Sequence, residues 1–421
     1  MQNNVRFQSL LFHTATCAAT AALTTAIVLA LICTFTQSAQ GQTFKVLHNF
    51  TGGQDGGTPS AGLTIDNAGN LYGTAESGGS GSGTVFRLVR RGSAWIFTPL
   101  YSFAGGSDGA NPSGTVIFGP NGALYGTTLD GGTGGCYFGA CGTVFNLKPP
   151  PTACKTAICP WTETVLYRFA GDPDGGSPAG GLIFDQVGNM YGTTDFGGVG
   201  GGTIFEMTPS NGSWEESVLH ALSDGTHPFS GVIFDNAGNL YGTTTGGGDD
   251  YVGAVFELSP SGSGWTEKVL YSFHRDSGGN TPYAGLIFDQ SGNLYGAAIN
   301  GGSGGGGTIF KLIPSNGSWT YKVIYSFTGG IECGPGGSLV MDGAGNLYGT
   351  TLCDGANQAG SVFRLTPSGN GWTYTSLYDF TNGSDGGSPY CSVVFDAYGN
   401  LYGTTEHGGL RGGGVVFEIT P

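Results

Sequence analysis

The sequence predicts an all-β fold, a seven-bladed β-propeller of four-stranded antiparallel blades. Three observations lead to this prediction. A motif, Gly-Asn-Leu-Tyr-Gly-Thr at residues 69–74, recurs along the chain in steps of 50 to 66 residues. Each repeat contains short stretches with the residue pattern of β-strands. The last repeat lacks its outer strand, and an additional strand of that type stands near the start of the chain. The motif tyrosines are Tyr72, Tyr125, Tyr191, Tyr241, Tyr295, Tyr348 and Tyr402.

One repeat shows the expected elements in order. Residues 265–273 alternate apolar and polar side chains, which indicates a strand, and a polar loop follows. Residues 285–289 are almost wholly apolar, which predicts a strand that is buried on both faces. A tight turn at 290–292 leads to a third strand at 293–296, and a Gly-rich loop leads to a fourth at 307–314. Four short antiparallel strands in about fifty residues are typical of one propeller blade.

The ring is expected to close with a strand from the start of the chain. Six tryptophans (Trp95, Trp161, Trp214, Trp265, Trp319 and Trp372) each stand just before an outer strand, but the seventh repeat ends without one. Residues 44–50, Phe-Lys-Val-Leu-His-Asn-Phe, match that outer strand, and Gln42 occupies the place of the missing tryptophan. We therefore predict that strand 44–50 pairs with the last blade and leaves few exposed sheet edges.

The chain is expected to be a leader followed by one domain. Residues 1–41 are predicted to be a signal peptide, because a charge at Arg6 precedes an apolar run and a small-x-small site at 39–41. A membrane anchor is the alternative, because the apolar run approaches the length that spans a bilayer. Residues 42–421 are predicted to form a single propeller. Its expected parts are the closing strand 44–50 and blades at 51–103, 104–169, 170–222, 223–273, 274–327, 328–380 and 381–421.

Composition and charge restrict the partners. The net charge is −15 with only 14 Lys and Arg, which opposes binding to a nucleic-acid backbone. The charged fraction of 10% suits a secreted protein with a surface of small polar residues. The 83 glycines stand at fixed places beside aromatic and β-branched runs, so we interpret them as turn residues. We expect a secreted or cell-surface monomer with no nucleic-acid partner and no membrane span after residue 41.

Export permits disulfide bonds. The expected local pairs are Cys136–Cys141 and Cys154–Cys159, because both lie in the one repeat with a long insertion. A four-thiolate zinc site is the alternative, but the spacing is looser than in common zinc ribbons. Cys333, Cys353 and Cys391 can form one further bond, for which Cys333–Cys353 is the candidate, and they leave one thiol over.

Residues that recur in nearly every repeat are interpreted as structural. The motif tyrosines and the six tryptophans are expected to pack between blades, with aromatic ligand platforms as the alternative. The aspartates that end the inner strand are expected to cap turns. They are Asp66, Asp185, Asp235, Asp289, Asp342 and Asp396, with Gly119 in the remaining repeat. A second set of aspartates lies in the Asp-Gly-x-x-Pro loops. We expect these residues to stabilise turns, and Ca²⁺ binding is the alternative. These calcium candidates are Asp55, Asp108, Asp174, Asp224 and Asp385.

Function is expected where the repeats differ. Because strand direction alternates, the Asp-Gly-x-x-Pro loops and the Gly-rich loops should share one rim of the ring. The repeats diverge four and five residues after the motif tyrosine, where the Gly-rich loops begin. Loops on a rigid scaffold are where recognition accumulates, so we interpret this rim as a binding face. Its candidate ligand-binding residues are Glu76, Asp130, Asp195, Asn300, Glu406 and His407.

The sequence favours a protein that is not an enzyme, and it supplies no catalytic residue. Histidine lies near charged residues at His407, His274 and His227, but no pattern shows that any of them meets a partner for acid–base chemistry. No nucleophile elbow, metal-binding histidine pair, phosphate loop or dinucleotide fingerprint is found in the sequence. No cofactor is expected apart from the Ca²⁺ alternative.

The assembled motifs resemble a known family. Gly-Leu-Ile-Phe-Asp, Asp-x-x-Gly-Asn-Leu-Tyr-Gly-Thr-Thr and Gly-Thr-Val-Phe-x-Leu-x-Pro together resemble the GloVer tandem-repeat proteins, over essentially all of residues 44–421. That resemblance implies a secreted bacterial protein rich in glycine. The Asp-x-x-Gly-Asn-Leu-Tyr hairpin is also similar to that of NHL and gluconolactonase-like propellers, which supports the fold. Neither resemblance implies an activity or a catalytic residue.

The leading hypothesis is a secreted binding or scaffold module that presents its variable rim to an extracellular glycan, peptide or protein. The alternative is an extracellular lyase or hydrolase that acts on a polymer at the central channel, with assistance from Ca²⁺ bound by the loop carboxylates. A third hypothesis is a purely structural role in an extracellular matrix.

Overall fold

The computed structural model describes residues 42–132, 135–136, 141–150, 161–223, 226–262, 264–275 and 278–420. The predicted signal peptide, the pair Cys154–Cys159 and the calcium candidate Asp224 lie outside these residues. Phe44–Thr420 forms one compact unit. In the described part of the chain, no helix has the length and apolar character needed to cross a membrane.

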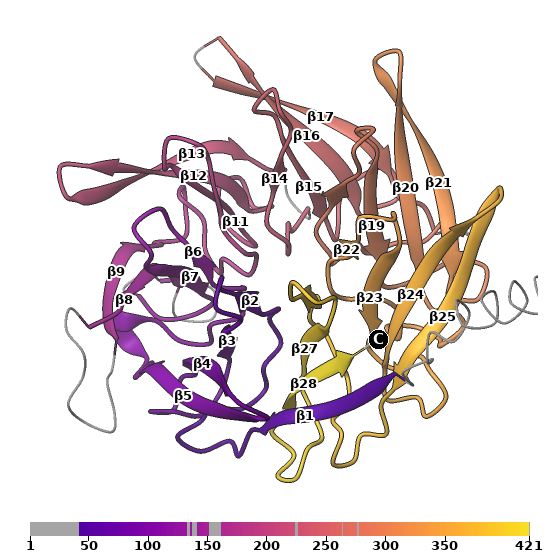
Figure 1. The fold of residues 1–421 in the computed structure, drawn as a ribbon. Coiled ribbons are helices and arrows are strands. Elements are labelled where there is room, and N and C mark those ends of the chain that lie inside the picture. Colours follow the sequence, from indigo (N-terminus) through magenta and orange to yellow (C-terminus); the bar gives the residue numbers. More distant parts are fainter. Residues whose placement is uncertain are drawn as a thin grey trace, which may run out of the picture. The chain divides into compact units, whose positions relative to one another are not determined.

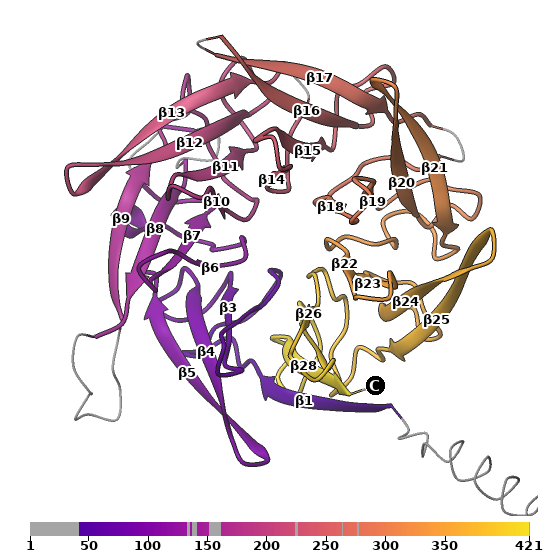
Figure 2. The same cartoon turned by 45° about the horizontal axis from the view of Figure 1, so that its top comes forward.

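Seven four-stranded antiparallel sheets form a ring (Figures 1 and 2), which confirms the predicted seven-bladed β-propeller. Blade 1 contains β2 (Thr64–Ile65), β3 (Leu71–Ala75), β4 (Thr84–Arg91) and β5 (Ala94–Ser102); the 3-10 helix η1 (Gly106–Asp108) follows it. Blade 2 contains β6 (Ile117–Phe118), β7 (Leu124–Thr128), β8 (Thr143–Lys148) and β9 (Thr162–Arg168). Blade 3 contains β10 (Ile183–Phe184), β11 (Met190–Thr194), β12 (Thr203–Ser210) and β13 (Ser213–Ala221).

The next three blades repeat this order from the inner to the outer strand. Blade 4 contains β14 (Ile233–Phe234), β15 (Leu240–Thr244), β16 (Ala254–Ser261) and β17 (Gly264–Ser272). Blade 5 contains β18 (Ile287–Phe288), β19 (Leu294–Ala298), β20 (Thr308–Ser315) and β21 (Ser318–Ser326). Blade 6 contains β22 (Val340–Met341), β23 (Leu347–Thr351), β24 (Ser361–Ser368) and β25 (Gly371–Asp379). In each blade the strands pair in sequence order, so neighbouring strands are joined by short turns and loops.

Blade 7 combines the two ends of the ring. It contains β26 (Val394–Phe395), β27 (Leu401–Thr405) and β28 (Val415–Thr420), and its outer strand is β1 (Thr43–Asn49). The Phe50 amide donates to the Gly414 carbonyl oxygen at 3.0 Å, just beyond the strand pair. The Phe44 ring stacks on Tyr378 of blade 6, with the ring centroids 3.7 Å apart. The predicted closure is therefore confirmed, with the strand one residue earlier than expected.

The motif tyrosines pack between blades, as predicted. Tyr72 of blade 1 is 4% exposed, and its ring meets Phe118 and Trp161 of blade 2. The same contact between the tyrosine of one blade and the tryptophan of the next recurs around the ring, including Tyr402 of blade 7 with Trp95 of blade 1. The tryptophans thus pack at the seams, and each of the seven hydrophobic clusters draws on two consecutive blades.

The motif glycine lies inside a strand, as the predicted strand 293–296 places Gly296, and it serves packing there. The general interpretation of the glycines as turn residues is therefore wrong for this position. A Cβ on Gly73 would lie 2.6 Å from Cζ of Phe86 on the adjacent strand. The corresponding glycine meets the corresponding phenylalanine in every blade, for example Gly403 with Phe417 at 2.5 Å. Each of these phenylalanines is fully or almost fully buried. Glycine is therefore required because any side chain would displace the core ring.

A second set of contacts joins the outer strands of neighbouring blades. Tyr271 stacks on Tyr321 with the ring centroids 3.8 Å apart, and His220 Nε2 lies 3.0 Å from a carboxylate oxygen of Glu267. Two further seams have a glutamate at the position of Glu267, namely Glu163 in blade 2 and Glu216 in blade 3. One carboxyl oxygen of each is buried without a hydrogen-bond partner. Burial, and then the charge of a nearby aspartate, raise the pKa of each carboxyl to about 7.

Removal of residues 42–49 tests the ring closure. We expect this truncation to lower the free energy of unfolding by several kcal/mol, because the burial of Phe44, Val46 and Leu47 is lost and β28 becomes an exposed edge. That loss is a large part of the ~5–15 kcal/mol that stabilises a typical domain. Urea unfolding of the truncated and full chains measures it, with the exposed substitution Lys45→Ala as the control. An unchanged urea midpoint would show that β1 does not close the ring.

The two raised carboxyl pKa values predict that stability falls as the pH rises. The fold favours the protonated form of Glu163 and Glu216. Their contribution to the free energy of unfolding is therefore fully present below about pH 4.5 and is lost as the pH rises through about 7. We expect the double variant Glu163→Gln, Glu216→Gln to be more stable at pH 8 by about 1 kcal/mol per site. This figure is smaller than the shifts alone imply, because both side chains remain partly exposed.

Thermal melting at pH 5 and pH 8 measures this effect. Glu215→Gln, on an exposed side chain of the same strand as Glu216, is the matched control and should leave the pH dependence unchanged. Equal pH dependence in the double variant and the unaltered protein would contradict the prediction.

Candidate functional site

The two variable loops of each blade lie together on one rim, as strand parity predicts. In blade 1, the Glu76 amide donates to the Thr58 carbonyl oxygen at 3.2 Å and the Ser77 amide to Gly57 at 3.1 Å. The Glu406 amide likewise donates to Ser388 in blade 7. These bonds join the start of each Gly-rich loop to the residues that precede the proline of the Asp-Gly-x-x-Pro loop. The rim is therefore a fixed backbone frame for the variable side chains.

The proline of each loop is held against the preceding blade. A Cβ on Gly83 of blade 1 would lie 2.5 Å from Cδ of Pro112 in blade 2. The same close approach joins Gly360 to Pro389 and Gly414 to Pro59. The residue after the proline is thereby placed at the central opening, where a small cavity of about 120 Å³ is lined from all seven blades. We call this site the channel mouth, and its post-proline residues are Ser60, Ser113, Ala179, Phe229, Tyr283, Gly336 and Tyr390.

Three aromatic side chains gather at the channel mouth. The rings of Phe229 and Tyr283 meet edge to face at 5.0 Å, and those of Tyr283 and Tyr390 at 6.2 Å. Gly336 of blade 6 leaves room for this group, since a Cβ there would lie 3.3 Å from the Tyr390 ring. Four blades carry Ser, Ala or Gly at the same position, so the aromatic residues are not needed for the packing of a blade.

Two carboxylates of the rim, Glu76 and Glu406, act on the residues of the mouth through a hydrogen bond to Ser60 and through their charge on Tyr390. The Ser60 hydroxyl donates to Glu76, and burial raises the pKa of the Glu76 carboxyl. Burial, and then the charge of Glu76, raise the pKa of Glu406. Burial also raises the pKa of Tyr390, and the charges of Tyr283, Glu406, Glu332 and Glu76 raise it further. Among the described residues that line the mouth, none is Lys or Arg, so the site carries negative potential.

Asp195 and His227 form a pair beside this group. His227 Nδ1 lies 3.2 Å from Oδ1 of Asp195 and 3.1 Å from the Asp195 carbonyl oxygen, and its hydrogen-bond geometry favours the carbonyl. Asp195 is 6% exposed, and its Oδ1 is left as a buried acceptor without a hydrogen bond. Burial raises the pKa of Asp195, and the neighbouring His227 offsets this only in part. Burial, then the charge of Glu332 and then that of Asp195 raise the pKa of Tyr283, and His227 stands two residues before Phe229 in the same loop.

The other predicted rim residues have separate roles. Asp130 accepts a hydrogen bond from the Asn111 side-chain amide at 2.7 Å. Asn300 Oδ1 accepts from the Glu332 amide at 2.6 Å and so positions the loop that carries Glu332. The His407 side chain is 58% exposed, and its Nε2 lies 3.9 Å from Glu406. The structure therefore brings Glu76 and Glu406 together near the mouth, with Asp195 close by, whereas Asp130 and Asn300 support loops.

The described calcium candidates hold their own loops. Asp108 accepts from the Ala104 amide and the Tyr101 hydroxyl, and Asp174 accepts from the Ala170 amide and the Tyr167 hydroxyl. Asp385 accepts from Thr381 and Tyr378, and Asp55 from Thr51 and His48. Among the described residues, no three His, Cys, Asp or Glu side chains are grouped so that they could hold a metal ion. These hydrogen bonds favour the interpretation that the aspartates stabilise their own turns over the interpretation that they bind Ca²⁺.

The inner-strand aspartates cap turns through one repeated network. Asp66 Oδ1 accepts from the Ala68 and Asn70 amides, and its Oδ2 accepts from the Asn70 side chain and the Tyr72 hydroxyl. Blade 2 has Gly119 at this position, and a Cβ there would lie 2.3 Å from the Tyr125 ring. Asn121 replaces the missing aspartate, since its Nδ2 donates to the Tyr125 hydroxyl and its Oδ1 accepts from the Ala123 amide.

Two of the expected disulfide bonds are formed, Cys136–Cys141 and Cys333–Cys353. Cys391 is buried with a free thiol, which accepts from the Thr404 amide at 3.1 Å. Cys333–Cys353 joins the two loops of blade 6, so it restrains the loop that carries Glu332.

Sequence reasoning missed Phe229, Tyr283, Tyr390 and Glu332. It compared the repeats after the motif tyrosine and treated the Asp-Gly-x-x-Pro loop as a turn. The residue that follows the proline also varies from repeat to repeat, and this signal could have found the three aromatic residues. Glu332 stands in one of the two loops that lack the aspartate, Gly-Gly-Ile-Glu-Cys-Gly-Pro at 329–335.

A closed ring of seven similar blades with a variable mouth defines a β-propeller repeat protein. The chain belongs to the Gloeobacter/Verrucomicrobia repeat family, whose sequence profile matches residues 32–159, 152–291 and 252–421. This confirms the resemblance drawn from the motifs. No curated protein matches the chain closely enough to be counted as a relative.

Solved propeller structures resemble the chain at low identity. A protein from Thermus thermophilus, described as a candidate oxidoreductase (glucose dehydrogenase), is 16% identical over 90% of this chain and 100% of its own, with a TM-score of 0.46. A protein of unknown function from Dyadobacter fermentans is 10% identical over 90% and 98%, with a TM-score of 0.46. A candidate 6-phosphogluconolactonase from Bacteroides uniformis is 16% identical over 75% and 83%, with a TM-score of 0.48. No residue role in this chain is inferred from them.

The loop geometry predicts that calcium leaves the stability unchanged. A site with a Kd of about 1 mM would add about 1 kcal/mol at about 5 mM Ca²⁺, which is enough to move the melting temperature by a few degrees. We expect melting curves with about 5 mM CaCl₂ and with chelator to coincide, because Asp108, Asp174 and Asp385 already accept hydrogen bonds from their loops. A calcium-dependent rise that Asp385→Asn abolishes would restore the calcium interpretation.

Proposed function

We propose that the chain is an extracellular binding module that holds part of its partner at the channel mouth. The observation that carries this proposal is the meeting of Phe229, Tyr283 and Tyr390 with the carboxylates Glu76 and Glu406 at one opening. These residues come from blades 1, 4, 5 and 7, so only the closed ring assembles them. The blades are alike in their packing residues and differ here, which supports recognition rather than folding.

The chemistry of the mouth favours a cationic group. Aromatic faces attract an ammonium or guanidinium ion, and the surrounding carboxylates add charge attraction. An acidic glycan would meet the same carboxylates and be repelled. Of the classes considered, a peptide or protein segment that presents a Lys or Arg side chain therefore suits the site best. Binding such a cation would also lower the raised pKa values of Glu76 and Glu406, so it should release protons in the pH range where these carboxyls titrate.

A lysine peptide tests the proposal. We expect pentalysine amide to bind the full chain, and its affinity to fall at least about tenfold in Tyr283→Ala and in the double variant Glu76→Gln, Glu406→Gln, since a charge-assisted contact is worth about 1.5–3 kcal/mol. Isothermal titration calorimetry measures the affinity, and repetition in buffers of different ionisation enthalpy measures the released protons. Ala179 occupies the position of Tyr283 in blade 3, so Tyr283→Ala keeps a residue that the repeat tolerates.

Pentaglutamate is the charge control, and Val187→Ala, on a turn of the opposite rim, is the protein control. Pentaglutamate binding that is weakened by the mouth variants, or pentalysine affinity that is unchanged in them, would reject the cationic mouth.

A second candidate function rests on the Asp195–His227 pair. A buried carboxylate with an unused acceptor beside an imidazole can act as a general base, as a hydrolase or lyase at the central opening would require. Polysaccharide or peptide turnover that Asp195→Asn abolishes, while binding and melting are retained, would favour this function over binding alone.

A further inference from the structure

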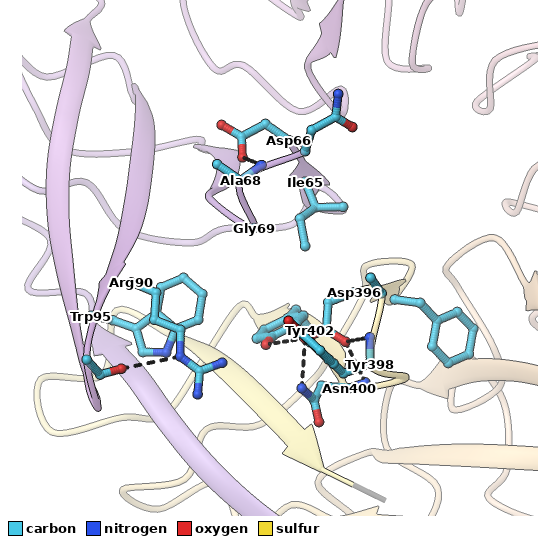
Figure 3. A pocket seen from close by; sticks show the side chains of 14 residues that line it. Ile65, Asp66, Ala68, Gly69, Arg90, Trp95, Asp396, Tyr398, Asn400 and Tyr402 are labelled. Atoms are coloured by element: carbon cyan, nitrogen blue, oxygen red, sulfur yellow. Dashed lines mark hydrogen bonds between the residues drawn. The ribbon is translucent and has the colours of Figure 1, made fainter.

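The opposite rim has a groove where blades 7 and 1 meet. We call it the seam groove, and it encloses about 900 Å³ between the turn at 65–69, the outer hairpin residues Arg90, Gly92 and Trp95, and the turn at 395–402. Its volume is within the range of about 300–1,000 Å³ that ligand pockets have. Figure 3 shows Arg90 and Trp95 on the hairpin of blade 1, with the turn of blade 7 that carries Asp396 and Tyr398 across from them.

Two departures from the repeat meet in this groove. In the sequence, the position of Arg90 is proline in the other six repeats, as Pro149, Pro209, Pro260, Pro314, Pro367 and Pro421. The position of Tyr398 is alanine in three other blades, as Ala68, Ala237 and Ala344. Arg90 belongs to the first blade and Tyr398 to the last, so only ring closure places them together. Neither change serves packing, because Arg90 is exposed and the Tyr398 side chain is 87% exposed.

Arg90 is the cation among the residues that line the groove. Asp66 and Asp396 also line it and keep their negative charges, and each carboxylate is held by four hydrogen bonds from its own turn, including those from Asn70 and Asn400. Arg90 donates through Nε to the Gly92 carbonyl oxygen at 3.4 Å, and the structure shows no ion pair for its guanidinium among the described residues.

Two further cations lie on or beside the same hairpin. Arg91 follows Arg90 directly, and the Lys45 ammonium of β1 donates to the Ser93 carbonyl oxygen at 2.9 Å. A local group of three cations in a chain of net charge −15 attracts an anion to this place. The groove thus presents a guanidinium fork beside the flat faces of Trp95 and Tyr398.

We propose that the seam groove binds an acidic carbohydrate, with the carboxylate of a uronic-acid unit on Arg90 and the sugar ring against Tyr398 and Trp95. A guanidinium pairs with a carboxylate through two parallel hydrogen bonds, which gives direction as well as attraction. Tyrosine and tryptophan supply an apolar face with a polar edge, as the face of a pyranose ring requires. A polysaccharide would run along the seam between the two turns.

Trigalacturonate is the probe for this site. We expect it to bind the full chain, and we expect its affinity to fall at least about tenfold in Arg90→Gln and in Tyr398→Ala. Tyr398→Ala restores the residue of three other blades, so a loss of folding would not explain the result. Val187→Ala is the matched control, because Val187 is the equivalent turn residue of blade 3 and is 81% exposed. Isothermal titration calorimetry at about 20 mM and about 200 mM NaCl measures each affinity and its salt dependence.

Neutral galactotriose and inorganic sulfate separate the two parts of the proposal. Weak or absent binding of galactotriose supports a role for the charge, and tighter binding of trigalacturonate than of sulfate supports a role for the sugar ring. The proposal is overturned if trigalacturonate does not bind, if it binds no tighter than either of the other two probes, or if Arg90→Gln and Tyr398→Ala leave its affinity unchanged.

Discussion

The seam between two blades is the unit on which this structure depends. A four-stranded blade with a two-residue inner strand cannot bury its own apolar faces, so its tyrosine is covered by the tryptophan and phenylalanine of the next blade. Because each seam needs a following blade, the last blade needs the first. Tyr402 against Trp95 and Phe44 against Tyr378 satisfy this requirement across the two ends of the ring.

Much of this architecture could be predicted from the sequence because it repeats. Seven copies of one motif reveal the number of blades, and the surplus strand at 44–50 reveals the closure. The role of Gly73 was missed because a strand glycine and a turn glycine are alike in sequence, and only the position of Phe86 separates them.

The candidate site was harder to predict, because its residues differ from one repeat to the next. Glu76 and Glu406 were chosen as variable residues, but they are 330 positions apart, and their proximity follows from the circular order of the blades. Phe229, Tyr283 and Tyr390 are single residues in loops that otherwise look like turns. A local motif cannot show that side chains from different blades point to one opening. The sequence could therefore indicate that the two sets of variable loops share one rim, but not the chemistry at its centre.

The strand order of blade 7 also has a consequence for synthesis. Its sheet pairs β1 with β28, and the other six blades lie between these strands in the sequence, so β1 stays unpaired until β28 has been made. A chain that stops short of β28 keeps an exposed strand edge and an uncovered Phe44, which are features that promote aggregation and proteolysis. The topology of the ring therefore means that only a chain that contains β28 can pair β1 and cover its edge.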